Sequence, residues 1–241
     1  MFTSYIIKGI GGFYYVKTAD AILECKPKGI FRKRRITPVA GDFVTVTEDG
    51  GTWVITDILP RKNVFVRPPI ANVDSFFIVV STVQPVPSTL IIDSLSAIAV
   101  DKGAKPYLII TKNDLGAADF IQTAYASSEI PVLVANAQTG EGIGEITALL
   151  KDKISVFCGN SGVGKSTLLS AVLGDRQLAA ADISKKLGRG KHTTREVELF
   201  EACGGLVADT PGFASLEMEK AAQLPKENLQ FAFLDIKRYF G

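Results

Sequence analysis

The sequence predicts an α/β protein in two parts, a small N-terminal β-barrel followed by a doubly wound sheet of strands and helices. Residues 1–68 contain short β-type runs with no helical periodicity. After them, apolar runs of strand length alternate with helical patterns. Pro68 and Pro69 stand between the two patterns, and adjacent prolines form a stiff connector that cannot continue a strand ladder.

The first part should contain about five short strands. A turn signal, Glu48–Gly51, joins the last two of them as a hairpin. Several short strands in so few residues are typical of a small closed barrel of the OB type, with an SH3-like barrel as the alternative. The expected strands are Ser4–Ile7, Phe13–Lys17, Ala21–Cys25, Asp42–Thr47 and Thr52–Ile58.

The second part should form a parallel sheet with helices on both faces. Its strand-like runs are short and almost wholly apolar, as buried parallel strands are. We expect residues 69–220 to form this domain and residues 221–241 to form a helical segment, because Pro225–Phe240 is amphipathic. The expected strands are Ser75–Ser81, Tyr107–Thr111, Val132–Ala135, Ile154–Cys158 and Gly205–Asp209, and the expected helices between them are Ser88–Asp101, Ala117–Ala126 and Ile143–Lys151.

Composition is that of a globular protein, with 46% hydrophobic and 22% charged residues in a chain of 241. The net charge of +2 is small, so any nucleic-acid binding must depend on local basic clusters. The three cysteines and single histidine are dispersed, which predicts neither a disulfide framework nor a zinc site within these residues. With no signal peptide and no apolar run of membrane-spanning length, we expect a cytoplasmic protein without membrane contact. We also expect it to be a monomer.

A glycine-rich turn, Gly159–Thr167, follows the expected strand Ile154–Cys158 and leads into a helical pattern. It fits G-x-x-x-x-G-K-[ST], the phosphate-binding loop, in the strand–loop–helix context that the motif requires. Backbone N–H groups and the helix N-terminus form an anion site there. Lys165 can reach the β- and γ-phosphates, and the Ser166 hydroxyl can bind Mg²⁺. The residues expected to contact nucleotide are Gly159, Asn160, Ser161, Gly162, Val163, Gly164, Lys165, Ser166 and Thr167.

The second expected strand ends in Thr111-Lys112-Asn113-Asp114, which matches [N/T]-K-x-D, a guanine-reading motif. The Asp114 carboxylate can accept from both the ring N1–H and the exocyclic amine of guanine, whereas adenine offers no such donor pair. The Lys112 stem can cover the face of the base. The third expected strand leads into Asn136 and Ala137, which occupy the position of a backbone element that contacts the guanine oxygen.

The last expected strand ends in Asp209-Thr-Pro-Gly212, a D-x-x-G element. Asp209 would hold Mg²⁺ through water, and the Gly212 N–H would sense the γ-phosphate. Before it, Leu187–Thr194 is a polar, glycine-containing stretch suited to a switch, in which Thr194, or else Thr193, completes the Mg²⁺ shell.

His192 lies in the same switch stretch and is placed to orient the attacking water, with a structural role as the alternative. Phe213 stands after Gly212, where many GTPases carry a water-orienting glutamine. Since a phenyl ring cannot orient water, intrinsic hydrolysis should be slow, on the order of 10⁻⁴ to 10⁻² s⁻¹.

A basic cluster without acidic residues spans Lys26–Arg35 in an expected inter-strand loop of the barrel. Such a cluster can be a solvated face, but its place in this fold favours RNA binding. Phe31 could stack on a base or pack in the core. The cationic residues expected to bind RNA are Arg32, Lys33, Arg34 and Arg35, with Arg61, Lys62 and Arg67 extending the surface.

The order of the motifs is inverted relative to an ordinary GTPase, because the guanine motif precedes the phosphate loop. The domain is therefore expected to be circularly permuted, which a sheet with neighbouring termini can accommodate.

A barrel preceding a permuted GTPase resembles the bacterial ribosome small-subunit-dependent GTPase A family. The resemblance runs from about residue 20 to the C-terminus and implies binding to the small ribosomal subunit late in its maturation, rRNA contact through the barrel, and hydrolysis stimulated by the subunit. Further motifs that agree are Gly29–Arg32, Leu59–Asn63, Arg67–Pro69, Gly188–Thr194 and Asp209–Phe213.

Members of that family continue into a zinc-binding module, whose ligands are absent from these residues. We therefore expect GTP or GDP and Mg²⁺, but no zinc, to bind this chain, and binding to the subunit to be weaker than in full-length relatives. The alternative functions are a nucleotide-gated rRNA-binding scaffold with negligible turnover and a phosphate-loop ATPase or small-molecule kinase.

Overall fold

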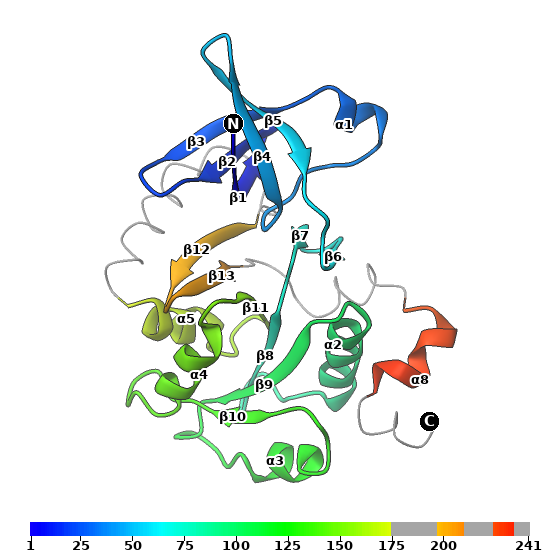
Figure 1. Cartoon of the computed structure of the whole chain (residues 1–241). Helices are drawn as coiled ribbons and strands as arrows, with labels where there is room; N and C mark the ends of the chain where they lie inside the picture. Colours follow the sequence, from blue (N-terminus) through cyan, green and yellow to red (C-terminus); the bar gives the residue numbers. More distant parts are fainter. Residues whose placement is uncertain (175–196, 210–223, 234–241) are drawn as a thin grey trace.

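The computed structural model describes residues 1–174, 197–209 and 224–233 and contains an N-terminal barrel beside an α/β sheet (Figure 1). The barrel is closed in the order β1-β2-β3-β5-β4. A simple meander would pair β3 with β4, but here β3 pairs in parallel with β5, and β4 returns to pair with β1. This Greek-key order is that of an OB-type barrel. The strands are β1 (Phe2–Ile10), β2 (Phe13–Lys17), β3 (Ile22–Pro27), β4 (Phe43–Asp49) and β5 (Thr52–Ile58).

The predicted strands and hairpin of the barrel are confirmed. Gly50 and Gly51 alone connect β4 to β5, and both have positive φ values, 57° and 76°. Two consecutive positive φ angles are those of the type I′ hairpin turn, and glycine adopts them without steric cost.

Phe31 is a core residue of the barrel. It lies in the short helix α1 (Ile30–Lys33), is only 4% exposed, and belongs to the same buried cluster as Ile6, Val46 and Ile55. The interpretation of Phe31 as a base-stacking residue is therefore wrong, because its ring is not available to a ligand.

Replacing Phe31 with alanine should lower the free energy of unfolding by about 3–4 kcal/mol, since it removes a buried ring and leaves a cavity. Urea denaturation followed by the fluorescence of Trp53, which packs against the same cluster, would measure the change. Phe31→Leu retains much of the buried volume and should cost clearly less. Equal stability of Phe31→Ala and the wild type would show that the ring is not packed.

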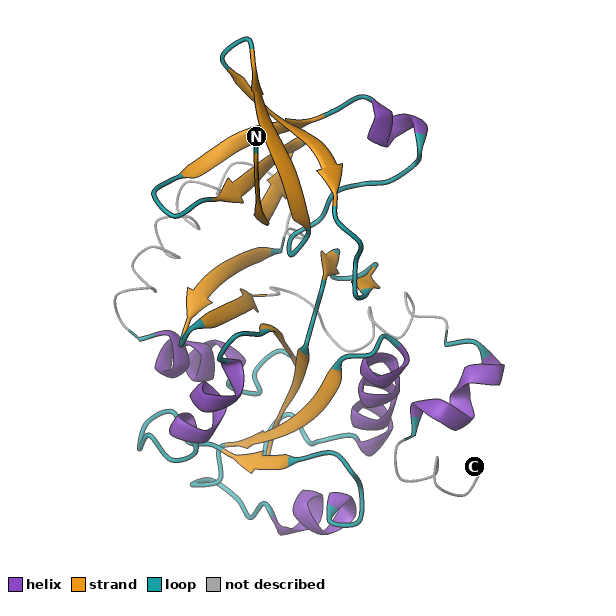
Figure 2. Cartoon of the chain, viewed as in Figure 1, coloured by secondary structure: helices purple, strands orange, loops and turns teal. Residues whose placement is uncertain are grey.

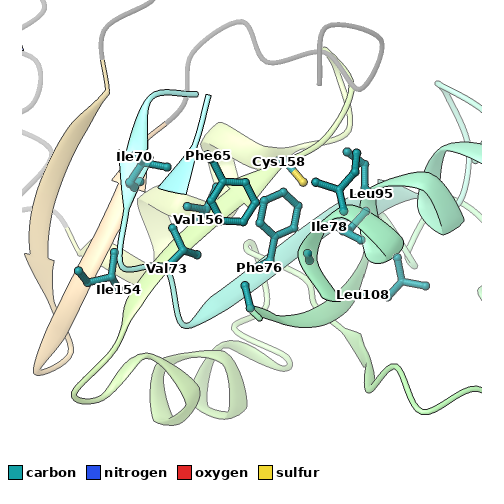
Figure 3. Close-up of a cluster of buried hydrophobic side chains, with 14 of the residues drawn as sticks. Phe65, Ile70, Val73, Phe76, Ile78, Leu95, Leu108, Ile154, Val156 and Cys158 are labelled. Carbon is teal, nitrogen blue, oxygen red and sulfur yellow. The ribbon is translucent and has the colours of Figure 1, made fainter. Parts of the chain in front are cut away.

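A short hairpin that the sequence does not predict connects the barrel to the sheet. It comprises β6 (Val64–Phe65) and β7 (Ile70–Ala71), which flank the two prolines and are too short to give a recognisable period. Phe65 and Ile70 are buried in the cluster that covers one face of the sheet, together with Phe76 and Val156 (Figure 3).

The second part is a six-stranded sheet in the order β10-β9-β8-β11-β13-β12. All neighbouring strands pair in parallel except β12, which is antiparallel to β13 at one edge. The strands are β8 (Ser75–Ser81), β9 (Lys105–Thr111), β10 (Val132–Val134), β11 (Ile154–Cys158), β12 (Glu198–Ala202) and β13 (Gly205–Asp209).

Helices cover both faces of this sheet, as predicted for a doubly wound fold (Figure 2). Side chains of β8 alternate between the two faces, so that Phe76 and Ile78 belong to one buried cluster and Phe77 to the other. The first cluster includes residues of α2 (Thr89–Asp101) and α3 (Asp119–Tyr125), and the second includes residues of α4 (Ile143–Leu150) and α5 (Lys165–Leu173).

The C-terminal described segment differs from the expected continuous helix. A 3₁₀ turn (Lys226–Asn228) leads into α8 (Leu229–Ala232), and Phe233 has an extended backbone. Asn228 donates a hydrogen bond to Asp101 at the end of α2, and α8 lies beside α2 (Figure 1). None of the helices within the described ranges is long and apolar enough to cross a membrane.

Candidate nucleotide-binding site

The carboxyl ends of the parallel strands bring the predicted motifs to one edge of the sheet. Thr111 ends β9, Asn136 follows β10, the glycine-rich turn follows β11, and β13 ends at Asp209. Ligands of doubly wound sheets bind at this edge. The motifs are thus gathered in space although they are spread over about a hundred residues of sequence.

The glycine-rich turn has the tight path of a phosphate-binding loop. At Gly159, φ is 157°, and a Cβ atom there would lie only 2.4 Å from the carbonyl oxygen of Val79 on β8, so only glycine fits. Gly164 is the N-cap of α5, whose first residue is the half-buried Lys165. The helix N-terminus and the cation therefore lie together, as binding of a phosphate requires.

Lys112 ties the guanine-reading loop to the phosphate loop. Its Nζ donates to the carbonyl oxygens of Gly162, at 2.6 Å, and Gln84, at 2.7 Å. The Thr111 hydroxyl lies 2.5 Å from the carbonyl oxygen of Val163. Because two residues of the guanine motif hold the phosphate loop directly, the spacing between base and phosphate subsites is fixed by the protein.

Asp114 is a solvent-exposed carboxylate, as hydrogen bonding to a guanine base requires. It is exposed, and its Oδ1 accepts a hydrogen bond of 3.2 Å from Nδ2 of the buried Asn136. The Oδ1 of Asn136 accepts in turn from the backbone N–H groups of Gln138 and Thr139, which fixes its orientation. No basic side chain of the described ranges forms an ion pair with Asp114, so its carboxylate is available to a ligand.

Three residues of the site were not predicted from the sequence. Thr82 donates to the Lys112 carbonyl at 2.6 Å, Gln84 accepts from Lys112, and Glu141 accepts from Asn113 Nδ2 at 2.9 Å. Thr82 and Gln84 follow the carboxyl end of β8. Asp114 was identified because ligands bind at the carboxyl ends of the strands in a doubly wound sheet. The same rule, applied to β8, would have identified Thr82 and Gln84.

Ser166 and Thr167 are exposed in the first turn of α5, and the Ser166 hydroxyl forms no hydrogen bond with the residues that the structure describes. A hydroxyl and a strand-terminal carboxylate are the oxygen donors that Mg²⁺ prefers, so Ser166 and Asp209 fit the ion chemically. Asp209 is placed as the last residue of β13. The predicted switch residues His192, Thr193, Thr194 and Gly212 lie outside the described residues.

Cys158, the residue before the phosphate loop, is a structural side chain. It is 1% exposed, and burial raises the pKa of its thiol far above the ordinary value, although nearby Lys165 opposes this shift. The thiol is therefore neutral at physiological pH and has no nucleophilic character. Among the described residues, no cluster of histidine, cysteine and acidic side chains could hold a metal ion.

The basic loop of the barrel is open to solvent, since Arg32, Lys33, Arg34 and Arg35 are all exposed. Arg61 does not extend this surface, because its guanidinium forms two hydrogen bonds, of 2.7 and 2.8 Å, with the buried carboxylate of Asp42. Lys62 is also paired, 2.7 Å from Asp74, but Lys62 and Arg67 are both exposed to solvent.

Comparison with known families covers most of the chain. Residues 58–219 match the model of the RsgA GTPase family, and residues 4–53 match that of the RsgA N-terminal domain. Two relatives are each called "Small ribosomal subunit biogenesis GTPase RsgA". The protein from Geobacillus thermodenitrificans is 40% identical, with 97% of this chain aligned to 81% of the relative. The protein from Bacillus subtilis is 41% identical, with 96% aligned to 81%.

Two solved structures share this fold. YjeQ from Thermotoga maritima superposes with a TM-score of 0.77 at 32% identity, covering 99% of this chain and 82% of its own. YloQ, described as a circularly permuted GTPase, superposes with a TM-score of 0.74 at 34% identity, covering 98% and 79%. The inverted motif order, the closed barrel and these matches agree, and the chain belongs to the RsgA GTPase family.

Proposed function

We propose that this chain hydrolyses GTP in the biogenesis of the small ribosomal subunit, and that the subunit stimulates hydrolysis. One observation carries the GTPase assignment: Lys112 joins a guanine-reading loop to the phosphate loop by its hydrogen bond to Gly162. Two relatives that are about 40% identical to this chain are named for biogenesis of the small ribosomal subunit. Their names support the subunit as the partner. In this scheme hydrolysis times the release of the protein from its partner.

The chemistry would divide between the two ends of the site. Asp114 accepts from the two donors of guanine, with Asn136 holding the carboxylate. Lys165 and the backbone N–H groups of the phosphate loop bind and orient the phosphates. Ser166, Asp209 and Thr194 would hold Mg²⁺, which neutralises charge on the transferred phosphoryl group when it is bound.

Hydrolysis without the partner should be slow. His192 would orient the attacking water, and Gly212 would report the presence of the γ-phosphate. Phe213 supplies no group that can position water. A partner-dependent rate follows, because the missing stabilisation must come from the subunit or from a switch that the subunit orders.

The barrel would make the RNA contact. We propose a barrel domain over residues 1–68, a permuted GTPase domain over residues 69–220 and a C-terminal segment over residues 221–241. The four exposed cations at positions 32–35 stand on the barrel, and the backbone of rRNA is the polyanion that they would contact. Their contribution to binding should therefore fall as the salt concentration rises.

Co-sedimentation with purified small subunits over a salt series tests this proposal. Wild-type protein should bind the subunits in the presence of a non-hydrolysable GTP analogue. The double variant Arg32→Ala/Lys33→Ala should make the negative slope of log K against log[salt] shallower, by about 0.7–0.9 for each phosphate that is no longer neutralised. The control variant Lys102→Ala/Lys151→Ala removes equal charge from the GTPase domain and should leave the slope unchanged. Absence of binding in every nucleotide state would overturn the proposed partner.

A further inference from the structure

Polar side chains of the barrel contact strand β12 of the GTPase sheet, including Lys17 on β2, which lies 3.9 Å from Glu201. Tyr5 on β1 donates a 2.7 Å hydrogen bond from its hydroxyl to Glu201, and Lys8 forms a 3.1 Å ion pair with Glu198. Burial, together with the Glu201 carboxylate, raises the pKa of Tyr5 well above its ordinary value, so the phenol remains a donor. The Lys8 and Glu198 side chains are 22% and 25% exposed, so solvent screens this pair less than it would a surface pair.

An irregularity in β1 makes this contact possible. The pairing register with β2 shifts between Ile6 and Lys8, which leaves Ile7 as an extra residue. In a regular strand Lys8 would face the same side as Ile6, which is buried in the barrel core. The shift instead pairs Lys8 with Tyr15 on the outer face, where Ile7 is buried in the cluster that covers one face of the GTPase sheet. The bulge thus turns Lys8 to the outer face of the barrel, where Glu198 lies, which regular alternation along the strand would not do.

The strand that the barrel holds leads directly to the metal-binding end of the site. In the ladder between β12 and β13, Glu198 is the register partner of Asp209. In the sequence, β12 lies between the switch residue Thr194 and Asp209. A displacement of Glu198 relative to the barrel must therefore be shared with the backbone that carries Asp209.

A second attachment of the barrel lies away from the switch strands. It passes through the connector, where Arg61 pairs with Asp42 and Asn72 donates to the carbonyl of Gly41. Between the connector and β12 lies a cavity of about 820 Å³, lined in part by Phe43, Lys153 and Leu206. Because this space is not packed, the direct link between the barrel and the switch end of the sheet consists of the polar pairs of Tyr5, Lys8 and Lys17 and the packing of Ile7.

We propose that Tyr5 and Lys8 are positioning residues of the GTPase, which couple the nucleotide state to the RNA-binding barrel through β12. This inference rests on the proposed function. By thermodynamic linkage, if GTP and GDP place β12 differently, the barrel binds its partner differently in the two states, and partner binding shifts nucleotide affinity by the same factor. Coupling of this kind typically amounts to about 5- to 150-fold in affinity.

A charge swap tests the coupling in the full chain. Lys8→Glu and Glu198→Lys each replace the ion pair with two like charges, and the double variant restores an opposite pair. The readouts are the ratio of small-subunit affinities with a GTP analogue and with GDP, and the Mg²⁺ concentration for half-maximal GTP hydrolysis. Lys102→Glu breaks a 3.2 Å pair with Asp101 on α2, away from β12, and serves as the matched control.

Each single variant should bring the affinity ratio at least about fivefold closer to 1 and raise the Mg²⁺ requirement, and the double variant should recover both. Tyr5→Phe, which keeps the ring but removes the hydrogen bond to Glu201, should change them in the same direction. Thermal unfolding checks that the variants are folded. A wild-type ratio near 1, or single variants that keep the wild-type ratio and Mg²⁺ requirement, would overturn the coupling.

The two proposals fail separately. If wild-type protein does not bind subunits, the proposed partner is wrong, and the Mg²⁺ concentration for half-maximal GTP hydrolysis then decides the positioning role of Lys8. If the wild type binds subunits and hydrolyses GTP but the swap series has no effect, only the coupling is wrong.

Discussion

Replacing Asp114 with asparagine should weaken GTP binding by about 10³- to 10⁴-fold and remove most of the preference for GTP over ATP. A carboxylate presents two acceptor oxygens to the two N–H donors of guanine, whereas an amide presents one acceptor and a donor that faces a donor. Asn136 already donates to one carboxylate oxygen, so its amide would also face a changed partner. Competition against a fluorescent GDP analogue measures both affinities.

Asp119→Asn is the matched control for this substitution. Asp119 is exposed in the first turn of α3, five positions along the chain, and its replacement removes the same charge without touching the guanine-reading loop. GTP affinity within about twofold of wild type is expected for it, as for surface changes generally. If Asp114→Asn bound GTP as tightly as Asp119→Asn does, the base would not be read by this carboxylate.

Replacing Lys165 with alanine should reduce GTP hydrolysis by at least about 10²- to 10³-fold, as is typical when a group that stabilises the transition-state charge is removed. Lys165 is the first residue of α5 and is half-buried next to the glycine-rich turn, so its positive charge lies at the expected phosphate site, and alanine provides no charge there. Single-turnover hydrolysis at saturating GTP separates this effect on chemistry from an effect on binding.

Lys105→Ala provides the comparison, because Lys105 begins β9 at the opposite edge of the sheet and is exposed. It should hydrolyse GTP at the wild-type rate. A Lys165→Ala variant that keeps its activity would show that the phosphate loop is not the site of hydrolysis.

The sheet could be predicted from the sequence because its strands are continuous apolar runs. The expected bounds of β8, β11 and β13 agree with the structure, since each strand is largely apolar and is followed by a polar or glycine residue. β12 was not predicted. It is an edge strand in which Glu198 and Glu201 flank two apolar residues, and the partners of those glutamates lie on the barrel, nearly two hundred residues away.

The site could be predicted to the level of its motifs but not of its connections. The guanine-reading loop and the phosphate loop were both identified from residue types and spacing. The hydrogen bond from Lys112 to Gly162 could not be predicted from the sequence. It depends on a left-handed backbone at Lys112, with φ of 59°, and on the proximity of the guanine-reading loop to the phosphate loop. In the same way, nothing in the sequence indicates that Arg61 pairs with a buried carboxylate.

The interaction between barrel and sheet is the part that sequence patterns conceal most completely. Alternation from the buried Ile6 would direct Lys8 into the barrel core, yet the register shift pairs Lys8 with Tyr15 on the outer face. Periodicity assumes a regular strand, so it cannot reveal a bulge.

The most direct test of the proposed GTPase function is the initial rate of multiple-turnover hydrolysis, measured with GTP and with ATP, in the presence and absence of purified small ribosomal subunits. We expect slow hydrolysis of GTP alone, on the order of 10⁻⁴ to 10⁻² s⁻¹, at least a tenfold increase when subunits are added, and no stimulated hydrolysis of ATP. A GTP rate that subunits do not change, or ATP hydrolysed as fast as GTP, would contradict it.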